Sequence, residues 1–350
     1  MSPATQTVPT DDLAPVPLRP LSVAQPACRF RLRPGDRPLV AAGDHVVLGE
    51  PLLERLRDAA AVERRLPLGL PEPSPGDTVE PDQVAPGGVR RGTRTEGPGR
   101  VLYLAPGRRL LVAVGRHSDV FPAPFAGTVE SVDRVALVLR ADGTGLPGAF
   151  AAGAASSGRL VVAVERPDAE LPASALDVAS EGAILVAGAR IDVEAISRAR
   201  AMGVRGLVVG GVVGRDLKAF VASEARQRAG LHTGLPFGLL VLDGFGKRPI
   251  PGVLWRALLA AEGHQVAIVG DPALLVLEPT APLPAPEPET IRVAAGELAG
   301  REGRLLALLG RRRLPAGARQ HAALVALAAD GPGRPALRVA LPLSDLERFG

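Results

Sequence analysis

Glycines, carboxylates and two basic residues follow a series of apolar segments between residues 183 and 247, and this set has the clearest potential for chemistry. In an open parallel sheet, ligands bind beyond the carboxyl ends of the strands, where glycines admit an anion and helix N-termini favour negative charge. We therefore expect a small anionic ligand near Gly188, Asp192, Gly210, Gly211, Arg215, Asp216, Asp243 and Lys247, with Lys247 as a phosphate contact. The alternative is plain turn geometry, because short strand-to-helix connections need glycine without any ligand.

The glycine pattern does not specify a known nucleotide loop. The segment GGVVGRD (210–216) matches neither G-x-G-x-x-G nor G-x-x-x-x-G-K-[ST]. The five histidines are scattered, and a G-x-S-x-G nucleophile motif is missing. The single cysteine, Cys28, excludes a disulfide framework and a thiolate metal cluster, and it is interpreted as a small buried apolar residue. We therefore assign no catalytic residue and no metal ligand.

Basic residues gather near the C-terminus. Residues 289–350 contain ten arginines and six acidic residues, an excess of +4 that equals the net charge of the whole chain. We expect the run Arg311, Arg312 and Arg313 in a loop between strands, where it could contact phosphate groups together with Arg301 and Arg304. No aromatic residue lies between 289 and 348, so stacking on bases is not expected. Contact with a nucleic-acid backbone, or with a protein partner, fits this composition better than sequence-specific reading.

The segment FPAPFAGTVESVD (121–133) has an Ala-Pro step, a glycine and an alternating strand. This pattern resembles the hairpin half of biotin- and lipoyl-carrier domains, which attach their cofactor through a lysine. Lys218 and Lys247 are the only lysines in the chain, so covalent biotin or lipoate on this segment is excluded, and we expect no cofactor. The G-D-x-V half precedes the A-P-x-x-G-x-V half, an order that resembles the N-terminal domain of the RnfC family of the Rnf electron-transport complex. That family's redox activity is not expected here, because the cysteine clusters for iron–sulfur centres are missing.

The region around this segment reads as short strands with an internal repeat. GDHVVLGEPLLE (43–54) is echoed by GDTVEPDQVAPG (76–87). We expect residues 26–172 to form an all-β barrel-sandwich hybrid, in which the Pro- and Gly-rich insert 66–99 and the small-residue segment 143–158 are mostly loop. Residues 1–25 are rich in proline and lack periodicity, which predicts a disordered tail.

The pattern changes to alternating strands and helices in residues 173–277. Apolar strands are expected at 183–188, 204–211, 236–246 and 265–270, and helices at 192–203, 214–230 and 251–264, with Asp192 as N-cap, Gly203 after the first helix and Trp255 on an apolar face. Near-continuous apolar strands separated by helices predict a parallel sheet covered on both faces. A Pro-rich linker, 278–289, follows.

The C-terminal residues 290–350 return to short strands. In IRVAAGELAGREGRLLALL (291–309), Val293, Gly296, Gly300, Gly303 and Leu305 have the spacing V-x-x-G-x-x-x-G-x-x-G-x-apolar, and LPLSDLE (341–347) reads as a closing strand. This part resembles the KOW element of small SH3-like barrels in transcription elongation factors and ribosomal proteins. The resemblance implies binding to RNA, the ribosome or a polymerase.

The order of these segments resembles a bacterial family that joins a barrel-sandwich, a small α/β domain and a C-terminal KOW-type domain, and it implies architecture without an activity. We expect a cytoplasmic protein without membrane insertion, because the sequence shows no signal-peptide pattern and no apolar run of about 20 residues. Three functions stay open. The leading hypothesis is a non-enzymatic adaptor that docks a protein partner. The others are an RNA-, ribosome- or transcription-associated factor and an enzyme, or part of an enzyme, that uses the strand ends.

Overall fold

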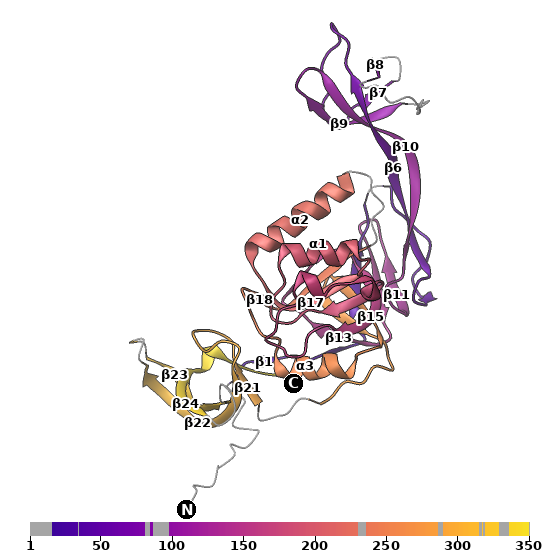
Figure 1. Ribbon diagram of the computed structural model, residues 1–350. Helices are drawn as coiled ribbons and strands as arrows, with labels where there is room; N and C mark the ends of the chain where they lie inside the picture. Colours follow the sequence, from indigo (N-terminus) through magenta and orange to yellow (C-terminus); the bar gives the residue numbers. More distant parts are fainter. Residues whose placement is uncertain are drawn as a thin grey trace, which may run out of the picture.

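The computed structural model describes residues 16–33, 35–80, 85–86, 98–229, 236–285, 290–314, 317, 319–328 and 336–349. Within these ranges the chain is mostly β, with three α-helices and four sheets. A central body carries a long β arm at one end and a C-terminal sheet at the other (Figure 1). The expected combination of β and α/β regions is thus found at the level of secondary structure.

A nine-stranded sheet forms the centre of the body. Its order is β14 (Phe150–Gly153), β18 (Gly238–Phe245), β17 (Gly206–Val212), β16 (Ala183–Val186), β15 (Ser156–Val162), β19 (Gln265–Gly270), β20 (Ala273–Leu277), β13 (Thr144–Pro147) and β2 (Val23–Ala24). Strands β15 to β18 are parallel to one another, whereas every other pair is antiparallel. The predicted parallel sheet is therefore correct only for its middle.

Two expectations about this sheet are wrong. Strand β19 is antiparallel, because it enters beside Arg159 in the middle of β15 and runs back towards Ser156. The segment 143–158 is not a loop, since it supplies β13, β14 and the start of β15. Its glycines serve close backbone approach instead: a Cβ on Gly153 would lie 2.3 Å from the carbonyl oxygen of Phe237.

Helices cover both faces of the parallel strands, as expected. Helices α1 (Val193–Ala201) and α2 (Gly214–Ala229) lie on one face, and α3 (Gly252–Ala260) packs its buried residues against the other. The predicted cap of α1 is confirmed, because the Asp192 carboxylate accepts a hydrogen bond of 2.8 Å from Ala195 N–H. Gly203 follows with φ of 78°, and Trp255 of α3 is buried.

A four-stranded sheet packs on the antiparallel half of the large sheet. Its order is β3 (Ala27–Arg31), β12 (Ala136–Ala141), β11 (Gly127–Val132) and β5 (His45–Val46). Cys28, Val129 and Leu137 share one apolar cluster with Ala267 and Val276 of β19 and β20. The first β region and the α/β region therefore share a core.

The arm is a ribbon of two long antiparallel strands, β6 (Pro51–Arg65) and β10 (Arg109–Pro122). Short strands complete its sheet: β4 (Arg37–Pro38), β7 (Thr78–Val79), β8 (Ala85–Pro86) and β9 (Gly99–Ala105). The tip has its own small core, formed by Leu66, Val79, Val101, Leu110, Val112 and Val114. Apart from β7, residues 67–80 are irregular, as predicted for the insert.

The sequence echo corresponds to a structural repeat. Gly43 N–H donates to Val129 O, and Gly76 N–H donates to Val101 O, each at 2.8 Å. The Asp44 carboxylate caps its turn by accepting from Ala41 N–H, as that of Asp77 does from Ser74 N–H, both at 2.7 Å. The turn at the arm tip thus repeats the turn in the four-stranded sheet.

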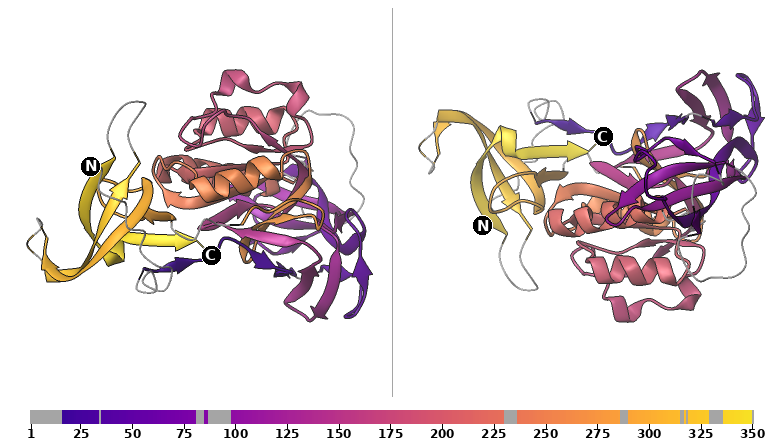
Figure 2. Two further views of the ribbon diagram at one scale, coloured as in Figure 1. Left: turned by 90° about the horizontal axis from the view of Figure 1, so that it is seen from below. Right: turned by 90° about the horizontal axis from the view of Figure 1, so that it is seen from above.

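The C-terminal sheet has the order β1 (Leu18–Arg19), β25 (Leu346–Phe349), β21 (Thr290–Val293), β22 (Glu302–Arg313), β23 (Arg319–Leu327) and β24 (Leu337–Pro342), with the 3-10 turn η5 (Leu343–Asp345) before β25. Figure 2 shows it beside α3. Part of the predicted tail is ordered here, because Val16 and Leu21 are buried and β1 pairs with β25. Residues 1–15 lie outside the described residues.

Candidate functional site

The ends of the parallel strands, where the sequence predicts a ligand, are covered by the chain itself. A Cβ on Gly188 would lie 2.0 Å from Ala169 O, and one on Gly210 would lie 1.9 Å from Arg248 O. Gly211 N–H donates to Ala189 O at 3.0 Å, and Arg248 N–H donates to the same oxygen at 3.1 Å. Segments 167–170 and 246–250 therefore occupy the space in which an anion was expected.

The charged side chains near this edge pair with one another. Lys247 Nζ lies 2.7 Å from one carboxylate oxygen of Glu170, and Arg190 Nε lies 3.0 Å from the other. The hydrogen bond from Lys247, with a smaller contribution from Arg190, lowers the pKa of Glu170. Lys247 is thus close to the edge as expected, but its nearest described charge is a carboxylate of the protein.

The remaining predicted ligand residues of the α/β region have separate surroundings. Asp192 caps α1, and the side chain of Arg215 is exposed at the start of α2. The Asp216 carboxylate is buried in the first turn of the same helix, with Arg215 Nε at 3.4 Å. An acidic side chain in this position stabilises the helix through its dipole. Asp243 takes part in a different cluster.

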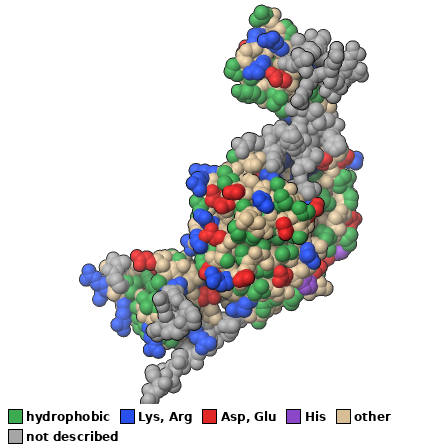
Figure 3. Space-filling view, viewed as in Figure 1, with side chains coloured by type: hydrophobic (Ala, Val, Ile, Leu, Met, Phe, Trp, Pro, Cys, Tyr) green, Lys and Arg blue, Asp and Glu red, His purple; other side chains and the backbone are tan. Residues whose placement is uncertain are grey.

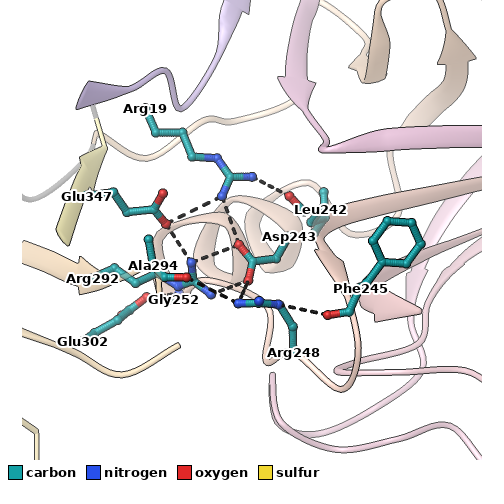
Figure 4. Close-up of polar contacts among 10 residues, drawn as sticks. All are labelled: Arg19, Leu242, Asp243, Phe245, Arg248, Gly252, Arg292, Ala294, Glu302 and Glu347. Atoms are coloured by element: carbon teal, nitrogen blue, oxygen red, sulfur yellow. Dashed lines mark hydrogen bonds and ion pairs between the residues drawn. The ribbon is translucent and has the colours of Figure 1, made fainter. Parts of the chain in front are cut away.

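Asp243, on β18, is the centre of an ion cluster that joins three parts of the chain (Figure 4). Arg292 of β21 holds both carboxylate oxygens, with Nη1 2.9 Å from one and Nη2 2.7 Å from the other. Arg19 of β1 lies 3.1 Å from Asp243, and Arg248 lies 3.5 Å away. Glu347 of β25 accepts from Arg292 at 2.6 Å. The cluster therefore ties the C-terminal sheet and the N-terminal segment to the body.

Arg292 is the most deeply buried member, with 1% of the residue exposed. Burial alone lowers the pKa of this guanidinium, but the hydrogen bonds and charges of Asp243 and Glu347 outweigh burial and raise it. Nearby, Glu302 accepts a 2.5 Å hydrogen bond from Gly252 N–H at the start of α3. A carboxylate in this position satisfies an end donor of the helix, so it adds a second link between the body and the C-terminal sheet.

The arginines predicted to contact phosphate differ in exposure from Arg292 of the ion cluster. Arg311, Arg312 and Arg313 are exposed, but they form the end of β22 and not a loop, since β22 continues to pair with β23 as far as Arg319. The two strands stay paired beyond the residues of the apolar cluster, as a two-stranded ribbon. Arg301, which directly precedes β22, donates to Ala328 O at 2.5 Å.

A second feature of these strands is an outer face, which we define as the side of β22, β23 and β24 that faces away from the core. Arg304, Ala326 and Arg338 lie in one row across it, whereas Leu305, Val325 and Val339 form the next row towards the core. Among the described residues, Arg304, Arg311, Arg313 and Arg338 form no ion pair. Figure 3 shows basic side chains around the C-terminal sheet, at the lower left of the view. Sequence reasoning missed Arg338. Its position between the apolar residues Leu337 and Val339 was a usable signal, because it fits a strand with one polar and one apolar face.

Cys28 is fully buried in the apolar cluster of the four-stranded sheet. Burial raises the pKa of the Cys28 thiol to about 12, with a further contribution from Asp271, so this thiol is protonated and unreactive at neutral pH. Within the described ranges, no group of three or more His, Cys, Asp or Glu side chains is placed to hold a metal ion. No helix in the described part of the chain is both long and apolar enough to cross a membrane.

Comparison with models of known protein families gives no match, and comparison with curated proteins gives none either. The contacts above are therefore the basis for a function. They separate the predicted site residues into four groups: a covered strand edge with Gly188, Gly210, Gly211 and Lys247, the starts of α1 and α2 with Asp192, Arg215 and Asp216, a buried ion cluster around Asp243, and the arginines on the C-terminal sheet.

Proposed function

We propose that the protein is a cytoplasmic, non-enzymatic adaptor, in which a fixed body holds two β elements that dock macromolecular partners. The observation that carries this proposal is the ion cluster around Asp243, which connects the body to the C-terminal sheet through buried, hydrogen-bonded charges. An ion cluster of this kind favours one arrangement of the body and the C-terminal sheet. In another arrangement the buried charges would lose their partners, which is energetically costly. A fixed arrangement is what a protein needs in order to present two surfaces at a set distance.

Strand topology and glycine geometry support the proposed identity of the two β modules. The order β25-β21-β22-β23-β24, with a 3-10 turn before the last strand, supports an SH3-like barrel of the KOW type. Gly296 and Gly300 have φ of 84° and 91°, and a Cβ on Gly303 would lie 2.1 Å from Ala326 O, which accounts for all three glycines of the motif. The four-stranded sheet with its Gly-Asp turn supports a barrel-sandwich hybrid without a carrier lysine.

Each end of the molecule presents a surface suited to a protein partner. At the arm tip, Leu68, Tyr103 and Leu111 are exposed, with Tyr103 directly opposite Leu111 in the sheet. At the other end, the outer face combines small residues with arginines. Tyrosine and arginine side chains are enriched at protein interaction surfaces.

Photo-crosslinking tests the adaptor proposal directly. A photoreactive phenylalanine analogue would replace Tyr103 or Arg313 in cells that make the protein, and Val221, exposed on α2, would serve as the matched control. We expect defined protein adducts from the first two positions and none from the third. Crosslinks that are equally weak at all three positions would contradict the proposal. Catalytic turnover that is lost in Asp216→Asn or Lys247→Met would favour the enzyme alternative instead.

A second candidate function is binding to RNA, the ribosome or the transcription machinery through residues 290–350. Exposed arginines without a carboxylate partner favour it, because they can release counterions from a phosphate backbone. In the same crosslinking experiment, adducts at position 313 that disappear on nuclease treatment would identify this function. Nuclease-resistant adducts would favour the adaptor.

A further inference from the structure

The C-terminal sheet ends in an open edge strand. Strand β24 pairs with β23 on one side, and no described strand pairs with its other side. Most other strands at the ends of the described sheets are only two residues long, and β14 has four residues. Strand β3 has five residues, but its outer edge already has a partner, because Arg29 N–H donates to Asp271 O at 2.7 Å. With six residues, β24 is the longest strand at the end of a sheet among the described residues, and open edges are templates for another strand.

The hydrogen-bond pattern shows which backbone groups of β24 are free to pair. Ala328 N–H donates to Glu302 O at 2.8 Å, and in a strand successive residues direct their N–H and C=O groups to opposite sides. The backbone N–H and C=O groups of Leu327 and Val325 therefore form hydrogen bonds with those of Leu337 and Val339, which lie opposite them in β24. The N–H and C=O groups of Arg338 and Ala340 consequently point away from β23.

The side chains beside this edge have two distinct characters. On the core side, Val339 lies opposite the buried Val325, and Leu337 is 41% exposed, so an added strand would find an apolar neighbour there. On the outer face, Arg338 is exposed and Arg304 lies in the same row beyond Ala326. Directly opposed side chains on neighbouring strands lie about 5 Å apart, so a carboxylate opposite Arg338 would be within reach of its guanidinium.

We propose that β24 binds an extended peptide as an additional strand, and that this peptide alternates apolar residues on the core side with acidic residues on the outer face. Backbone hydrogen bonds to Arg338 and Ala340 provide the pairing, and Arg338 with Arg304 selects the acidic residues. Strand addition therefore defines the partner class of the adaptor, and in this respect the inference rests on the proposed function.

The test uses the full-length chain and a labelled heptapeptide, Thr-Val-Glu-Val-Glu-Val-Thr, with blocked ends. Fluorescence anisotropy should show saturable binding that weakens about tenfold when lysine replaces both glutamates. Ala340→Pro should weaken binding by at least about tenfold, because proline removes one outward N–H and leaves the ladder to β23 intact. Arg338→Glu, which leaves the backbone unchanged, should reverse the preference so that the lysine peptide binds more tightly.

N-methylated peptides keep the test valid even if a protein variant does not fold. Methylation of one alternate set of peptide N–H groups should abolish binding, whereas methylation of the other set should be tolerated. Equal binding of the acidic and basic peptides, or no saturable binding up to about 1 mM, would overturn the inference. If the photoreactive analogue at position 313 still crosslinks to a protein in that case, the adaptor proposal stands and only strand addition fails. If wild-type protein binds polyuridylate and Arg338→Glu does not, nucleic acid is the partner instead.

Discussion

The C-terminal sheet contains arginines in two opposite environments. Arg292 is 1% exposed and holds both oxygens of Asp243, with Glu347 as a second acidic partner. Arg311 and Arg313, at the end of β22, are exposed and form no ion pair among the described residues. Burial of a charge costs several kcal/mol unless good partners compensate it, whereas an exposed charge stays hydrated at little cost. The first environment therefore fixes structure, and the second leaves the charge available to a partner.

The comparison shows that residue type does not reveal the role of an arginine in this chain. All but two of the 41 basic residues are arginine, so the choice of arginine over lysine carries little information. What separates the two environments is the presence of carboxylates from other segments. Asp243 comes from β18 and Glu347 from β25, and neither is near Arg292 in sequence. Variants of the two kinds of arginine, and of the residues around them, distinguish the structural role from the binding role.

The largest effect is expected for Arg292→Ala. This change leaves the buried Asp243 carboxylate with weaker partners, because Arg19 and Arg248 contact it at 3.1 Å and 3.5 Å without the paired geometry of Arg292. We expect the free energy of unfolding to fall by about 3–5 kcal/mol, as for other broken buried ion pairs. Urea denaturation measures it.

The matched control is Arg313→Ala, which should change the unfolding free energy by less than about 0.5 kcal/mol. The double variant Arg292→Met with Asp243→Leu removes both charges, so it should recover part of the loss. If Arg292→Ala were as neutral as Arg313→Ala, the two environments would not differ and the fixed arrangement of body and C-terminal sheet would lose its support.

A smaller loss is expected for Gly210→Ala, which tests the covered strand edge beside the cluster. A Cβ at this position would lie 1.9 Å from Arg248 O, on the segment whose side chain reaches Asp243. Overpacking against backbone should cost about 1–3 kcal/mol, measured by thermal or urea unfolding. Gly214→Ala is the control, because a Cβ there has open space and alanine favours the helix. Equal stability of the two variants would mean that an open crevice exists at the edge after all.

Lys247→Met should have a still smaller and pH-dependent effect. The hydrogen bond from Lys247 lowers the pKa of Glu170 below its usual value of 4.5, so the folded state gains stability above that pH and loses it as the pH falls. Because the pair is partly exposed, the loss at pH 7 should stay under about 1 kcal/mol. It should shrink when unfolding is measured well below pH 4.5. An equal loss at both pH values would point to packing and not to the ion pair.

Local features of the fold could be predicted from the sequence. The Asp192 cap and the glycine after α1 were correct, because a cap and its helix lie within a few residues of each other. The repeated Gly-Asp turns were recognisable for the same reason. Strand orientation was not predictable, since β19 pairs with β15 from more than 100 residues earlier, on the side away from the other parallel strands.

The candidate site was predicted only in part, and the reason is also distance along the chain. Asp243 was placed correctly near the end of β18, but its partner Arg19 is 224 residues away and lies in a segment predicted to be disordered. The backbone that covers Gly188 and Gly210 comes from segments 167–170 and 246–250, which carry no motif. Glycines at strand ends look alike in a sequence whether they border a ligand or another stretch of backbone.

The smallest effect on stability, and the largest effect on binding, is expected when Arg311, Arg312 and Arg313 are all changed to glutamine. These side chains are exposed at the end of β22, so the unfolding free energy should change by less than about 0.5 kcal/mol. Removing three positive charges should make the protein elute from a polyanion column such as heparin at clearly lower salt, because fewer counterions are released on binding. Arg190→Gln combined with Arg166→Gln provides a control that removes charges already close to Glu170 and Asp168. If the control shifted elution as strongly as the triple variant, the exposed arginines would act through net charge alone, and the outer end of β22 would have no claim as a docking surface.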